Sequence, residues 1–443
     1  MIRLPEPVLA ALARLEDAGW SAYAVGGCVR DLLRGTEPGD YDIATDAPPE
    51  ETERVFAAER VIETGLKHGT VTVLMSGMPL EITTFRVDGT YSDSRRPDAV
   101  RFTSSLREDL ARRDFTVNAI AFHPAEGIID PFSGREDLAA RMIRCVGDPD
   151  ARLREDALRI LRALRFAAVL GYEIEPATDA ALRRNRELLV KISAERVQIE
   201  LCKLICGVNA RRILMDYPDV LGVVLPEFLP MRGFDQHNVH HIYDVLQHTA
   251  VTVEHAPATP ALRLAALLHD IGKPDCFTLD EVGVGHFYGH PERSAEITDA
   301  ILRRLRFDNA TRERVVTLVR WHDRPIVQTE RAVRRALNQL GPEVFFELLA
   351  LKRADNLAQS PDYRGRQAEY DALERIAREI LERRECFSLR DLAVKGDDLA
   401  ALGFPKTKRL GETLHMLLDA VIDGTAMNEK SALLELAEKE RTQ

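Results

Sequence analysis

The apolar residues follow two different patterns along the chain. Up to residue 148, short apolar runs alternate with turn residues, which is typical of strands joined by short helices and turns. The expected strands are residues 22–25, 60–62, 70–75 and 80–84. From residue 150 onward, apolar residues recur at helical spacing, beginning with Leu153, Ala157, Ile160, Leu161 and Leu164. The pattern therefore predicts an α+β head followed by a series of helical domains.

Chain length and local composition suggest where these domains begin and end. The chain has 443 residues, more than a single hydrophobic core usually serves. We expect a head over residues 1–148, a helical neck over 149–210, a helical body over 211–370 and a helical tail over 371–443. Within the head, the polar segment from Arg86 to Asp98 has no periodicity, so we expect a mobile loop there.

Composition is that of an ordinary soluble globular protein, with 45% hydrophobic and 30% charged residues. No apolar run reaches membrane-spanning length. Charged residues such as Glu6 and Arg14 interrupt the N-terminal apolar segment, so it predicts an amphipathic helix and not a signal peptide. Six cysteines without a pairing pattern fit a reducing cytosol, and we expect a cytoplasmic location.

The charge balance limits how this protein could contact nucleic acid. A net charge of −11 argues against a generic nucleic-acid-coating protein, which would be basic. It still allows a local RNA-binding patch, and arginines are concentrated between Arg95 and Arg165. Acidic residues are interspersed among them, so ion pairing is an equally good interpretation for any single arginine.

The strongest chemical signal begins where the first apolar run ends. Gly26 and Gly27 follow this run, and a helical pattern starts directly after them. A glycine pair lets backbone N–H groups approach a ligand closely, and a helix N-terminus favours anions. Arg30, in the first helical turn, adds donors for phosphate oxygens. The segment is a candidate phosphate-binding turn, although a glycine pair on its own is usually only a tight turn.

Two carboxylates follow this helix. Asp40 and Asp42 are two residues apart where the next strand is expected, so their side chains point to the same face. This arrangement is unfavourable unless a cation lies between them. Mg²⁺, with nucleotide phosphates on its other side, meets that need. The two segments together predict a site for a metal-bound nucleoside triphosphate.

A third polar motif, RRDFTVNA, covers residues 112–119. In this motif, Arg113 is a candidate for contacting phosphate and Asp114 for accepting ribose hydroxyls. Thr116 and Asn118 are candidates for hydrogen bonds that orient the others.

In this order, the motifs resemble those of nucleotidyltransferases related to DNA polymerase beta. The runs GGCVRD, GDYDIAT and RRDFT-x-NA are similar to the bacterial-type (class II) tRNA nucleotidyltransferases, or CCA-adding enzymes, and to the bacterial poly(A) polymerases. The resemblance implies a polymerase-beta-like sheet in the head and a third catalytic carboxylate from a neighbouring strand, for which Glu81 is the candidate. It also implies that the loop after Arg86 favours full or A-adding activity over C addition alone.

A group of charged residues lies off the apolar face of the first expected neck helix. Asp156 and Arg159 are three positions apart, so the pattern alone favours a surface ion pair. The resemblance instead implies that this EDxxR motif, which starts at Glu155, is the protein template for the incoming base. Asp156 would accept from the exocyclic amine of cytosine or adenine, and Arg159 would donate to the adjacent ring nitrogen. Uracil and guanine present the reverse arrangement. Arg162 is a further candidate nucleotide-binding residue.

A separate signature begins near residue 236, where histidines become frequent. Imidazoles combined with carboxylates suit a divalent transition metal. The pattern resembles the HD superfamily of metal-dependent phosphohydrolases, with Mn, Ni, Co or Fe as the implied metal. The implied ligands are His248, His269, Asp270 and Asp355, with His290 and His322 for a second metal and Lys273 as the family lysine. For any single histidine, the alternative is a buried core or capping residue.

The resemblance implies a template-independent tRNA nucleotidyltransferase that adds C, C and A to tRNA 3′ ends from CTP and ATP. It implies Mg²⁺ at Asp40 and Asp42, release of pyrophosphate, and neither a membrane nor a protein partner. The nearer alternative is an A-adding enzyme or poly(A) polymerase of the same family, and the acidic pI of 5.7 argues against poly(A) addition. The more distant alternative is an HD phosphohydrolase whose inactive head binds RNA. The pair Glu195 and Arg196 resembles a family element that braces the neck, and we interpret it as structural. The sequence leaves open the oligomeric state and the activity of the HD site.

Overall fold

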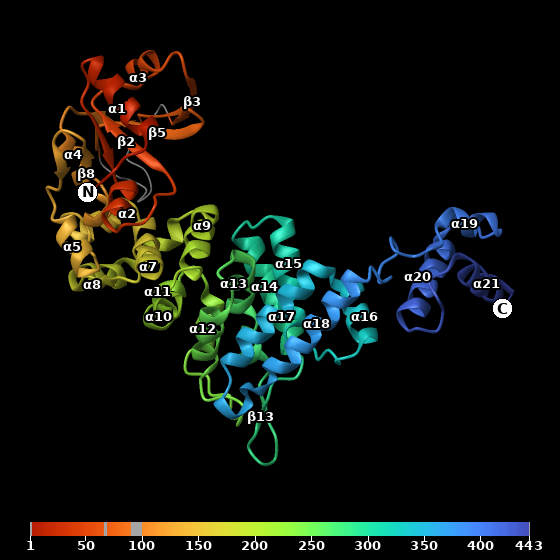
Figure 1. Ribbon diagram of the computed structural model, residues 1–443. Coiled ribbons are helices and arrows are strands. Elements are labelled where there is room, and N and C mark those ends of the chain that lie inside the picture. Colours follow the sequence, from red (N-terminus) through yellow and green to blue (C-terminus); the bar gives the residue numbers. More distant parts are fainter. Residues whose placement is uncertain (1, 66–68, 90–99, 443) are drawn as a thin grey trace. The chain divides into compact units, whose positions relative to one another are not determined.

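The computed structural model describes residues 2–65, 69–89 and 100–442 (Figure 1). The chain divides into two compact units, Met1–Leu229 and Pro230–Gln443. The first unit contains an α+β head followed by helices, and the second is almost entirely helical. The predicted class of fold is therefore confirmed. The finer domain boundaries stay a prediction.

The head is built on one seven-stranded sheet with the strand order β3-β4-β5-β2-β1-β8-β9. Its strands are β1 (Ala22–Val25), β2 (Tyr41–Thr45), β3 (Arg60–Gly65), β4 (Thr70–Met75), β5 (Met78–Thr84), β8 (Ala121–His123) and β9 (Gly127–Ile129). Strands β2 and β5 run parallel, and the other neighbouring pairs are antiparallel. All four strands expected from the apolar runs are present, and the DxD segment supplies β2.

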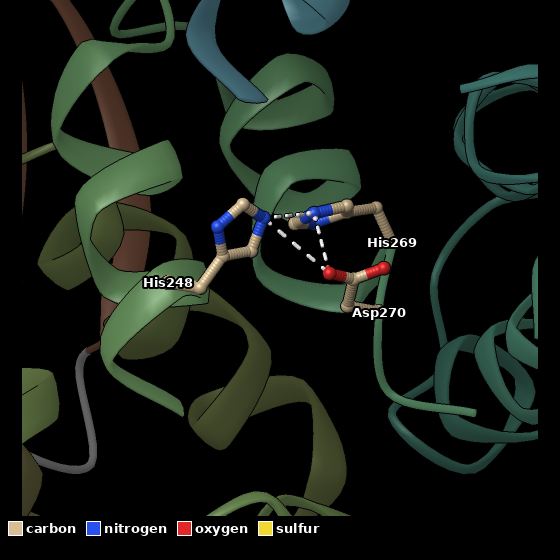
Figure 2. Close-up of side chains that lie close together, drawn as sticks. All are labelled: His248, His269 and Asp270. Atoms are coloured by element: carbon tan, nitrogen blue, oxygen red, sulfur yellow. Dashed lines mark hydrogen bonds and ion pairs between the residues drawn. The ribbon is translucent and has the colours of Figure 1, made fainter. Parts of the chain in front are cut away.

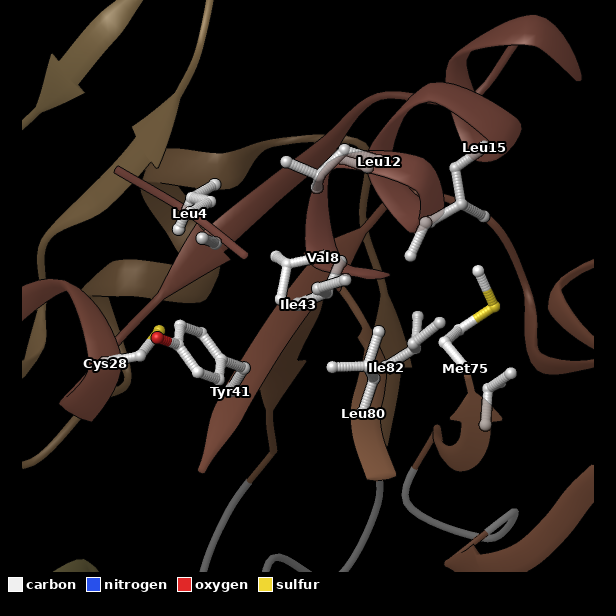
Figure 3. Close-up of a cluster of buried hydrophobic side chains, with 14 of the residues drawn as sticks. Leu4, Val8, Leu12, Leu15, Cys28, Tyr41, Ile43, Met75, Leu80 and Ile82 are labelled. Atoms are coloured by element: carbon white, nitrogen blue, oxygen red, sulfur yellow. The ribbon is translucent and has the colours of Figure 1, made fainter. Parts of the chain in front are cut away.

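The two faces of this sheet differ in what they pack against. One face packs against α1 (Glu6–Asp17) and α3 (Pro49–Val55), and Figure 3 shows the resulting core. Ile43 and Ile82 point into this core. Because side chains alternate along a strand, the neighbouring Asp42 and Glu81 point to the opposite face. The sheet thus separates the apolar core from the predicted carboxylates.

The segment expected to be a mobile loop begins instead as a strand. Residues Arg86–Asp88 form β6, which pairs with β7 (Val100–Phe102) in antiparallel fashion. The loop prediction is wrong for these three residues, because strand pairing depends on a partner that the local pattern does not contain. Residues 90–98 of that segment lie outside the described residues, as do 66–68 of an expected turn.

The expected neck helix is also interrupted. It forms two helices, α6 (Pro149–Glu155) and α7 (Leu158–Leu170), separated by an extended Asp156 with φ −134° and ψ 103°. The Asp156 carboxylate accepts a hydrogen bond from the backbone N–H of Leu158 at 3.1 Å. Aspartate readily makes such local bonds in place of continuing a helix, so the prediction of one continuous helix is wrong at this residue.

The remaining elements of the first unit connect the head to the neck and complete it. They are α2 (Gly27–Leu33), α4 (Leu106–Ala111), η2 (Thr116–Asn118), α5 (Gly134–Ala140), β10 (Met142–Ile143), β11 (Glu173–Ile174), α8 (Pro176–Asn185), η3 (Arg186–Lys191), α9 (Ala194–Ile205), α10 (Ala210–Asp216) and α11 (Pro218–Leu221).

The second unit consists mainly of helices, and its buried residues include one apolar cluster between Val333 and Ile380 and another between Cys386 and Ala437. Its first group is α12 (Val245–His255), α13 (Pro260–Leu268), α14 (His290–Arg304), α15 (Asn309–Trp321), α16 (Glu330–Leu340), α17 (Pro342–Leu357) and α18 (Gln367–Glu382). A short hairpin of β12 (Thr278–Leu279) and β13 (Gly285–His286) precedes α14. The last helices are α19 (Gly396–Ala401), α20 (Lys408–Ile422) and α21 (Lys430–Thr442). Among the described residues, no helix is both long and apolar enough to cross a membrane.

Candidate functional site

The glycine pair forms the turn between β1 and α2. Gly26 has φ 78° and ψ −129°, and its backbone N–H donates to the Ile120 carbonyl at 3.0 Å. A Cβ atom at this position would lie 2.7 Å from Nη1 of Arg113 and 3.7 Å from Oδ2 of Asp42. A glycine is therefore required here for two reasons, since the backbone is left-handed and a guanidinium comes close.

Replacing Gly26 by alanine is expected to cost about 1–3 kcal/mol of stability through the positive φ. It should also lower the rate of nucleotide transfer by about tenfold or more, because the Arg113 guanidinium has to move away from the carboxylates. Gly35→Ala is the matched control, since Gly35 has φ +74° but no atom within 4 Å of its added Cβ. Thermal melting and nucleotide incorporation measure the two effects. An equal loss of activity in both variants would contradict the role of Arg113.

Arg30 is buried beside this turn, with 9% of its surface exposed. Its Nη1 donates to Oδ1 of Asn118 at 2.7 Å, and its Nε and Nη2 donate to the two carboxylate oxygens of Asp31 at 2.9 and 2.8 Å. These bonds fix the guanidinium at the N-terminal end of α2, next to the glycine turn. Two residues of separate sequence motifs, Arg30 and Asn118, are thus joined directly.

The predicted carboxylates surround the end of β2. Asp42 lies opposite Val25 of β1 and Glu81 of β5 in the register of the sheet, and Asp40 immediately precedes the strand. Burial raises the pKa of Asp42 to about 6, with Asp40 and Glu81 adding to the rise and Arg113 opposing it. Asp40 and Asp42 carry like charges close together at this strand end, so these two carboxylates are candidates for holding a divalent cation.

Asp114 and Arg162 form a buried ion pair. The Oδ2 atom of Asp114 accepts from Nε and Nη2 of Arg162 at 2.8 and 2.5 Å, and its Oδ1 accepts from Asn118 Nδ2 at 3.0 Å. Burial alone would raise the pKa of Asp114, but Arg162 and Asn118 hold it well below its usual range. Both carboxylate oxygens therefore already hold protein donors. The expected contact of Asp114 with ribose stays a prediction, and so does the orienting role of Thr116, whose hydroxyl donates to Asp137 at 2.6 Å.

Asp156 and Arg159 are each held by other partners and do not pair with one another. Nη2 of Arg196 donates to Oδ2 of Asp156 at 2.7 Å. Nη1 of Arg159 donates to Oε2 of Glu155 at 2.7 Å, and its Nη2 donates to the Arg112 carbonyl at 3.0 Å. The surface ion pair expected from helical spacing is therefore wrong, because the helix breaks at Asp156. Arg159 is also buried.

Arg196 lines the site, although its sequence pattern predicts only a structural role. It lies in the first turn of α9, and its side chain reaches Asp156 across the neck. The one feature of the sequence that could have pointed to Arg196 is the resemblance of the Glu195-Arg196 pair to a neck-bracing element of the family. Its partner depends on the packing of α9 near the α6–α7 break, which local sequence does not reveal.

These side chains line one cavity of about 490 Å³. The predicted residues that line it are Gly26, Gly27, Arg30, Asp40, Asp42, Arg113, Asp114, Asn118, Asp156, Arg159 and Arg162. Further lining residues that were not predicted are Arg112, Leu158, Arg165, Phe166, Arg196 and Lys203. Glu81 is exposed and does not line the cavity, although it lies in register with Asp42. Eight basic side chains against four acidic ones suit a polyanionic ligand such as a triphosphate.

The histidines of the second unit come together in its helical core. Figure 2 shows His248 of α12 beside His269 and Asp270, which follow α13. The Nε2 atoms of His248 and His269 are 3.3 Å apart, and Oδ2 of Asp270 lies 3.4 and 3.2 Å from them. Oδ1 of Asp355 lies 2.9 Å from Nε2 of His248.

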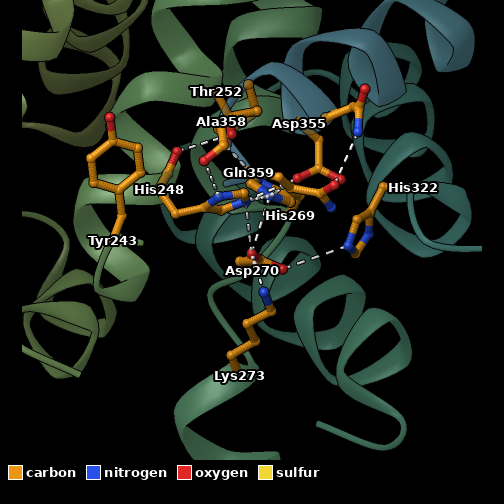
Figure 4. A network of polar contacts seen from close by, with 12 residues as sticks. Tyr243, His248, Thr252, His269, Asp270, Lys273, His322, Asp355, Ala358 and Gln359 are labelled. Atoms are coloured by element: carbon orange, nitrogen blue, oxygen red, sulfur yellow. Dashed lines mark hydrogen bonds and ion pairs between the residues drawn. The ribbon is translucent and has the colours of Figure 1, made fainter. Parts of the chain in front are cut away.

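A second group of ligand atoms uses the other oxygen of the same aspartate. The Nε2 atoms of His290 and His322 are 3.2 Å apart, and Oδ1 of Asp270 lies 3.4 and 3.6 Å from them. Nζ of Lys273 lies 2.7 Å from Oδ2 of Asp270. Figure 4 shows His248, His269, Asp270, Lys273, His322 and Asp355 of this network. All six residues predicted as ligands in this region are thus brought together, with Asp270 between the two groups.

Backbone carbonyls determine which ring nitrogens face inward. Nδ1 of His269, His290 and His322 lies 2.8, 2.9 and 2.6 Å from the carbonyl oxygens of Ala266, Phe287 and Val319, respectively. A carbonyl only accepts, so each Nδ1 carries a hydrogen, and each Nε2 offers a lone pair when the ring is neutral. Lone pairs that face each other are unfavourable without a cation between them, and metal-binding histidines typically donate their other ring N–H to a backbone carbonyl in this way.

The charges near these rings favour a cation as well. Burial lowers the pKa of His269, but Asp270 and Asp355 outweigh that effect and raise it to about 10. A positive species between the rings is therefore stabilised. An adjoining cavity of about 750 Å³ leaves room for a substrate next to the ligands.

Three family models match the chain. One described as "Poly A polymerase head domain" matches residues 22–144. One described as "Probable RNA and SrmB-binding site of polymerase A" matches residues 171–231. One described as "tRNA nucleotidyltransferase domain 2 putative" matches residues 292–437. The first match contains the glycine turn, Asp40, Asp42 and the RRDFTVNA motif, whereas residues 145–170 lie between the first two matches, and the third covers much of the second unit.

Known proteins are similar over nearly the whole chain. The chain is 35% identical to a CCA-adding enzyme of Limosilactobacillus fermentum over 98% of its own length and 96% of that protein. It is 49% identical to a CCA-adding enzyme of Geobacillus stearothermophilus over 47% of its own length and 51% of that protein.

Two solved structures extend the likeness to the fold. The structure of the Bacillus stearothermophilus CCA-adding enzyme in complex with CTP has a TM-score of 0.74 and 30% identity, and the match covers 99% of both chains. The Thermotoga maritima CCA-adding enzyme complexed with tRNA matches with a TM-score of 0.59 and 19% identity, over 99% of this chain and 96% of that one, and therefore shares the fold.

Proposed function

This chain belongs to the CCA-adding enzyme family of tRNA nucleotidyltransferases, and we propose that it adds C, C and A to tRNA 3′ ends from CTP and ATP at the cavity of its first unit. The observation that carries this assignment is the convergence of the glycine turn, the carboxylates and the RRDFT and EDxxR residues on one cavity. Solved relatives with CTP and with tRNA support these two substrates. A cytoplasmic location stays a prediction.

In the proposed reaction, the head residues position and neutralise charge. Asp40 and Asp42 would hold Mg²⁺, with Glu81 as the third candidate carboxylate. Burial, the main cause of the raised pKa of Asp42, disfavours the charge of this group, and a bound cation would offset that cost. When bound, such an ion acidifies the primer 3′-hydroxyl and neutralises phosphate charge. Arg30 and Arg113 lie next to the glycine turn, where they would contact the departing phosphates. No covalent protein nucleophile is needed, because phosphoryl-group transfer depends mainly on positioning and charge stabilisation.

Base selection would rest on Asp156 and Arg159. Arg196 and the Leu158 N–H hold the Asp156 carboxylate, and Glu155 and two backbone carbonyls hold the Arg159 guanidinium. An acceptor and a donor fixed in this way match the Watson–Crick edges of cytosine and adenine. Because neither group is free to rotate toward a reversed edge, uracil and guanine would leave buried groups unpaired.

Primer extension tests the proposed activity. Three tRNAs, ending before CCA, after C and after CC, are each given CTP, ATP or both. We expect stepwise completion to CCA that then stops. Addition of A to the CC-ended tRNA alone would indicate an A-adding enzyme, and an unlimited A ladder would indicate a poly(A) polymerase. No incorporation at all would contradict the proposal.

A second function is favoured by the paired histidine groups of the second unit. His248, His269, Asp270 and Asp355 would hold one divalent transition ion, and Asp270, His290 and His322 would hold another. Bound ions of this kind supply Lewis-acid activation of a phosphate ester and an acidic water. Lys273, 2.7 Å from Asp270, would keep this shared carboxylate ionised and in place. The unit would then hydrolyse phosphoesters, such as those at RNA ends.

Metal analysis of histidine variants tests this second function. We expect about two ions per purified chain, about one in His248→Ala and about one in His290→Ala, because each change removes a nitrogen ligand from a different group. His255→Ala is the control, since His255 is an exposed residue at the end of the same helix as His248. Phosphatase activity should follow metal content. A purified chain without bound ions that stays inactive after addition of Ni²⁺, Co²⁺ or Mn²⁺ would contradict the hydrolase assignment.

A further inference from the structure

A second cavity of the first unit is separate from the nucleotide site. It has a volume of about 510 Å³ and is lined by the ends of α2, α5 and α7 together with Tyr172. The helix α7 connects the two cavities, because Leu158 at its start lines the nucleotide site and Leu170 at its end lines the second cavity. At helical rise, these two residues are about 18 Å apart.

The charged residues of this cavity are all basic. Arg34, Arg135 and Arg141 line it, and no acidic side chain does so among the described residues. Arg34 keeps a 3.4 Å contact with Asp31. The guanidinium groups of Arg135 and Arg141 have no acidic or carbonyl partner in the described part of the chain. In a chain with a net charge of −11, such a grouping leaves donors available for an external anion.

An apolar wall completes the cavity. Leu33 and Leu138 line it, and the ring of Tyr172 lies 5.7 Å from the guanidinium carbon of Arg34. The Tyr172 ring is buried, with 5% of its surface exposed, so the exposed guanidinium plane of Arg34 over that ring is the group on which a nucleic-acid base would stack. The cavity thus combines donors for a phosphate with a surface for a flat, largely apolar ring.

The backbone holds Arg141 and Tyr172 in place. The N–H of Glu173 donates to the Arg141 carbonyl at 2.9 Å, and β10 and β11 pair next to this bond. Arg141 follows α5 with φ 55°, a left-handed conformation in which glycine is the usual residue. An arginine at this position directs a charged side chain to the cavity at a conformational cost that glycine would avoid.

We propose that this cavity binds a nucleotide by its phosphate and its base. Arg135 and Arg141 would contact the phosphate, and the apolar wall near Tyr172 would contact the base. The match to a polymerase RNA-binding model begins at residue 171, so an RNA strand is one source of this nucleotide and a free mononucleotide is the other. Guanidinium forks suit phosphate oxygens especially well, which favours a phosphate over a simple halide or hydroxyl ligand.

Equilibrium dialysis of the full chain with uridine 5′-monophosphate tests the proposal. Uridine is chosen because its Watson–Crick edge is the reverse of the one that Asp156 and Arg159 would accept. We expect saturable binding that becomes about tenfold weaker in the Arg135→Gln/Arg141→Gln double variant, equivalent to about 1.4 kcal/mol. Arg54→Gln/Arg60→Gln is the control, since both arginines are exposed residues outside this cavity and the charge change is the same. Arg34 is left unchanged, because its partner Asp31 also holds Arg30.

Further binding measurements identify the ligand and its source. Asp156→Ala should bind uridine monophosphate as the unaltered chain does, and loss of binding there would assign the ligand to the nucleotide site and overturn the proposal. Equal binding by the double variant and the unaltered chain, or no saturable binding at about 1 mM, would also overturn it. Inorganic phosphate should bind more weakly, and equal affinity would overturn the role of the base. A tetrauridylate that binds more tightly than the monophosphate, and only with both arginines present, supports an RNA strand. Equal affinity of the two supports a free nucleotide.

Discussion

Replacing Asp42 by asparagine is expected to lower the rate of nucleotide transfer by about a thousandfold or more, which corresponds to about 4 kcal/mol of lost transition-state stabilisation. Asparagine has nearly the same shape, so the packing around β2 should be kept. The change removes the charge that would hold the metal ion between Asp40, Asp42 and the triphosphate. Single-turnover incorporation of CTP on a tRNA that ends before CCA measures this loss.

The matched control is Asp46→Asn. Asp46 follows the same strand, and its carboxylate accepts a hydrogen bond from the Ser21 N–H at 2.7 Å, which an asparagine oxygen can also accept. We expect this variant to keep its activity. Both variants should have closely similar melting temperatures. A normal rate in Asp42→Asn would show that the metal assignment is wrong.

The pKa of Asp42 adds a pH dependence to this prediction. Burial raises that pKa to about 6, and the ionised carboxylate is the form that binds a cation. Below pH 6, metal binding must therefore displace a proton, so the apparent affinity for Mg²⁺ should fall by up to about tenfold for each pH unit. Above this pH, affinity should be nearly constant. Mg²⁺ titrations of the transfer rate between pH 5 and 8 measure the effect, and a constant affinity down to pH 5 would contradict it.

Replacing Arg159 by alanine is expected to remove most of the discrimination between CTP or ATP and UTP or GTP. The guanidinium would be the donor that matches the ring nitrogen of cytosine and adenine. An unpaired buried group costs about 1–3 kcal/mol, so in the unaltered chain Arg159 should disfavour each wrong base by about 5- to 150-fold. Transfer from CTP and ATP should fall, while the rates with UTP and GTP should fall much less. Competition between radiolabelled CTP and UTP measures the ratio.

Arg154→Ala is the control for this second prediction. Arg154 is on α6 in the same segment, but its Nε donates to Asn185 at 3.0 Å and its side chain is 67% exposed. It does not line the cavity. We expect its selectivity to equal that of the unaltered chain. If Arg159→Ala keeps its preference for C and A, Arg159 has no templating role.

Replacing Arg196 should affect base selection less than replacing Arg159 does. Arg196 contacts Asp156 and not Arg159. Its replacement should therefore leave the Asp156 carboxylate, the acceptor, less firmly held, while the Arg159 guanidinium, the donor, stays in place. The same competition assay would then show a smaller loss of discrimination than in Arg159→Ala.

The sequence by itself determined the main elements and most of the site. Gly26, Asp42 and Asn118 were predictable because the pattern that marks each of them lies within a few neighbouring residues of the sequence. These patterns are a glycine turn between a strand and a helix, a carboxylate on a strand, and a short polar motif. The grouping of the candidate histidine ligands was predictable for a related reason, since a few residue types in a fixed order suit a metal. The α+β head and the helical remainder followed from the apolar spacing, which depends only on the period of each element.

The tertiary structure decided which groups meet and how they are held. Strand β6 forms because residues 100–102 pair with it, and Asp156 leaves the helix to cap α7 and to bind Arg196 of α9. The carbonyls that orient the imidazoles, and the three arginines around Tyr172, also come together through folding. The physical reason is the same in each case. Local sequence sets the period and the charge of an element, whereas the partner of a side chain depends on segments that only packing brings within reach.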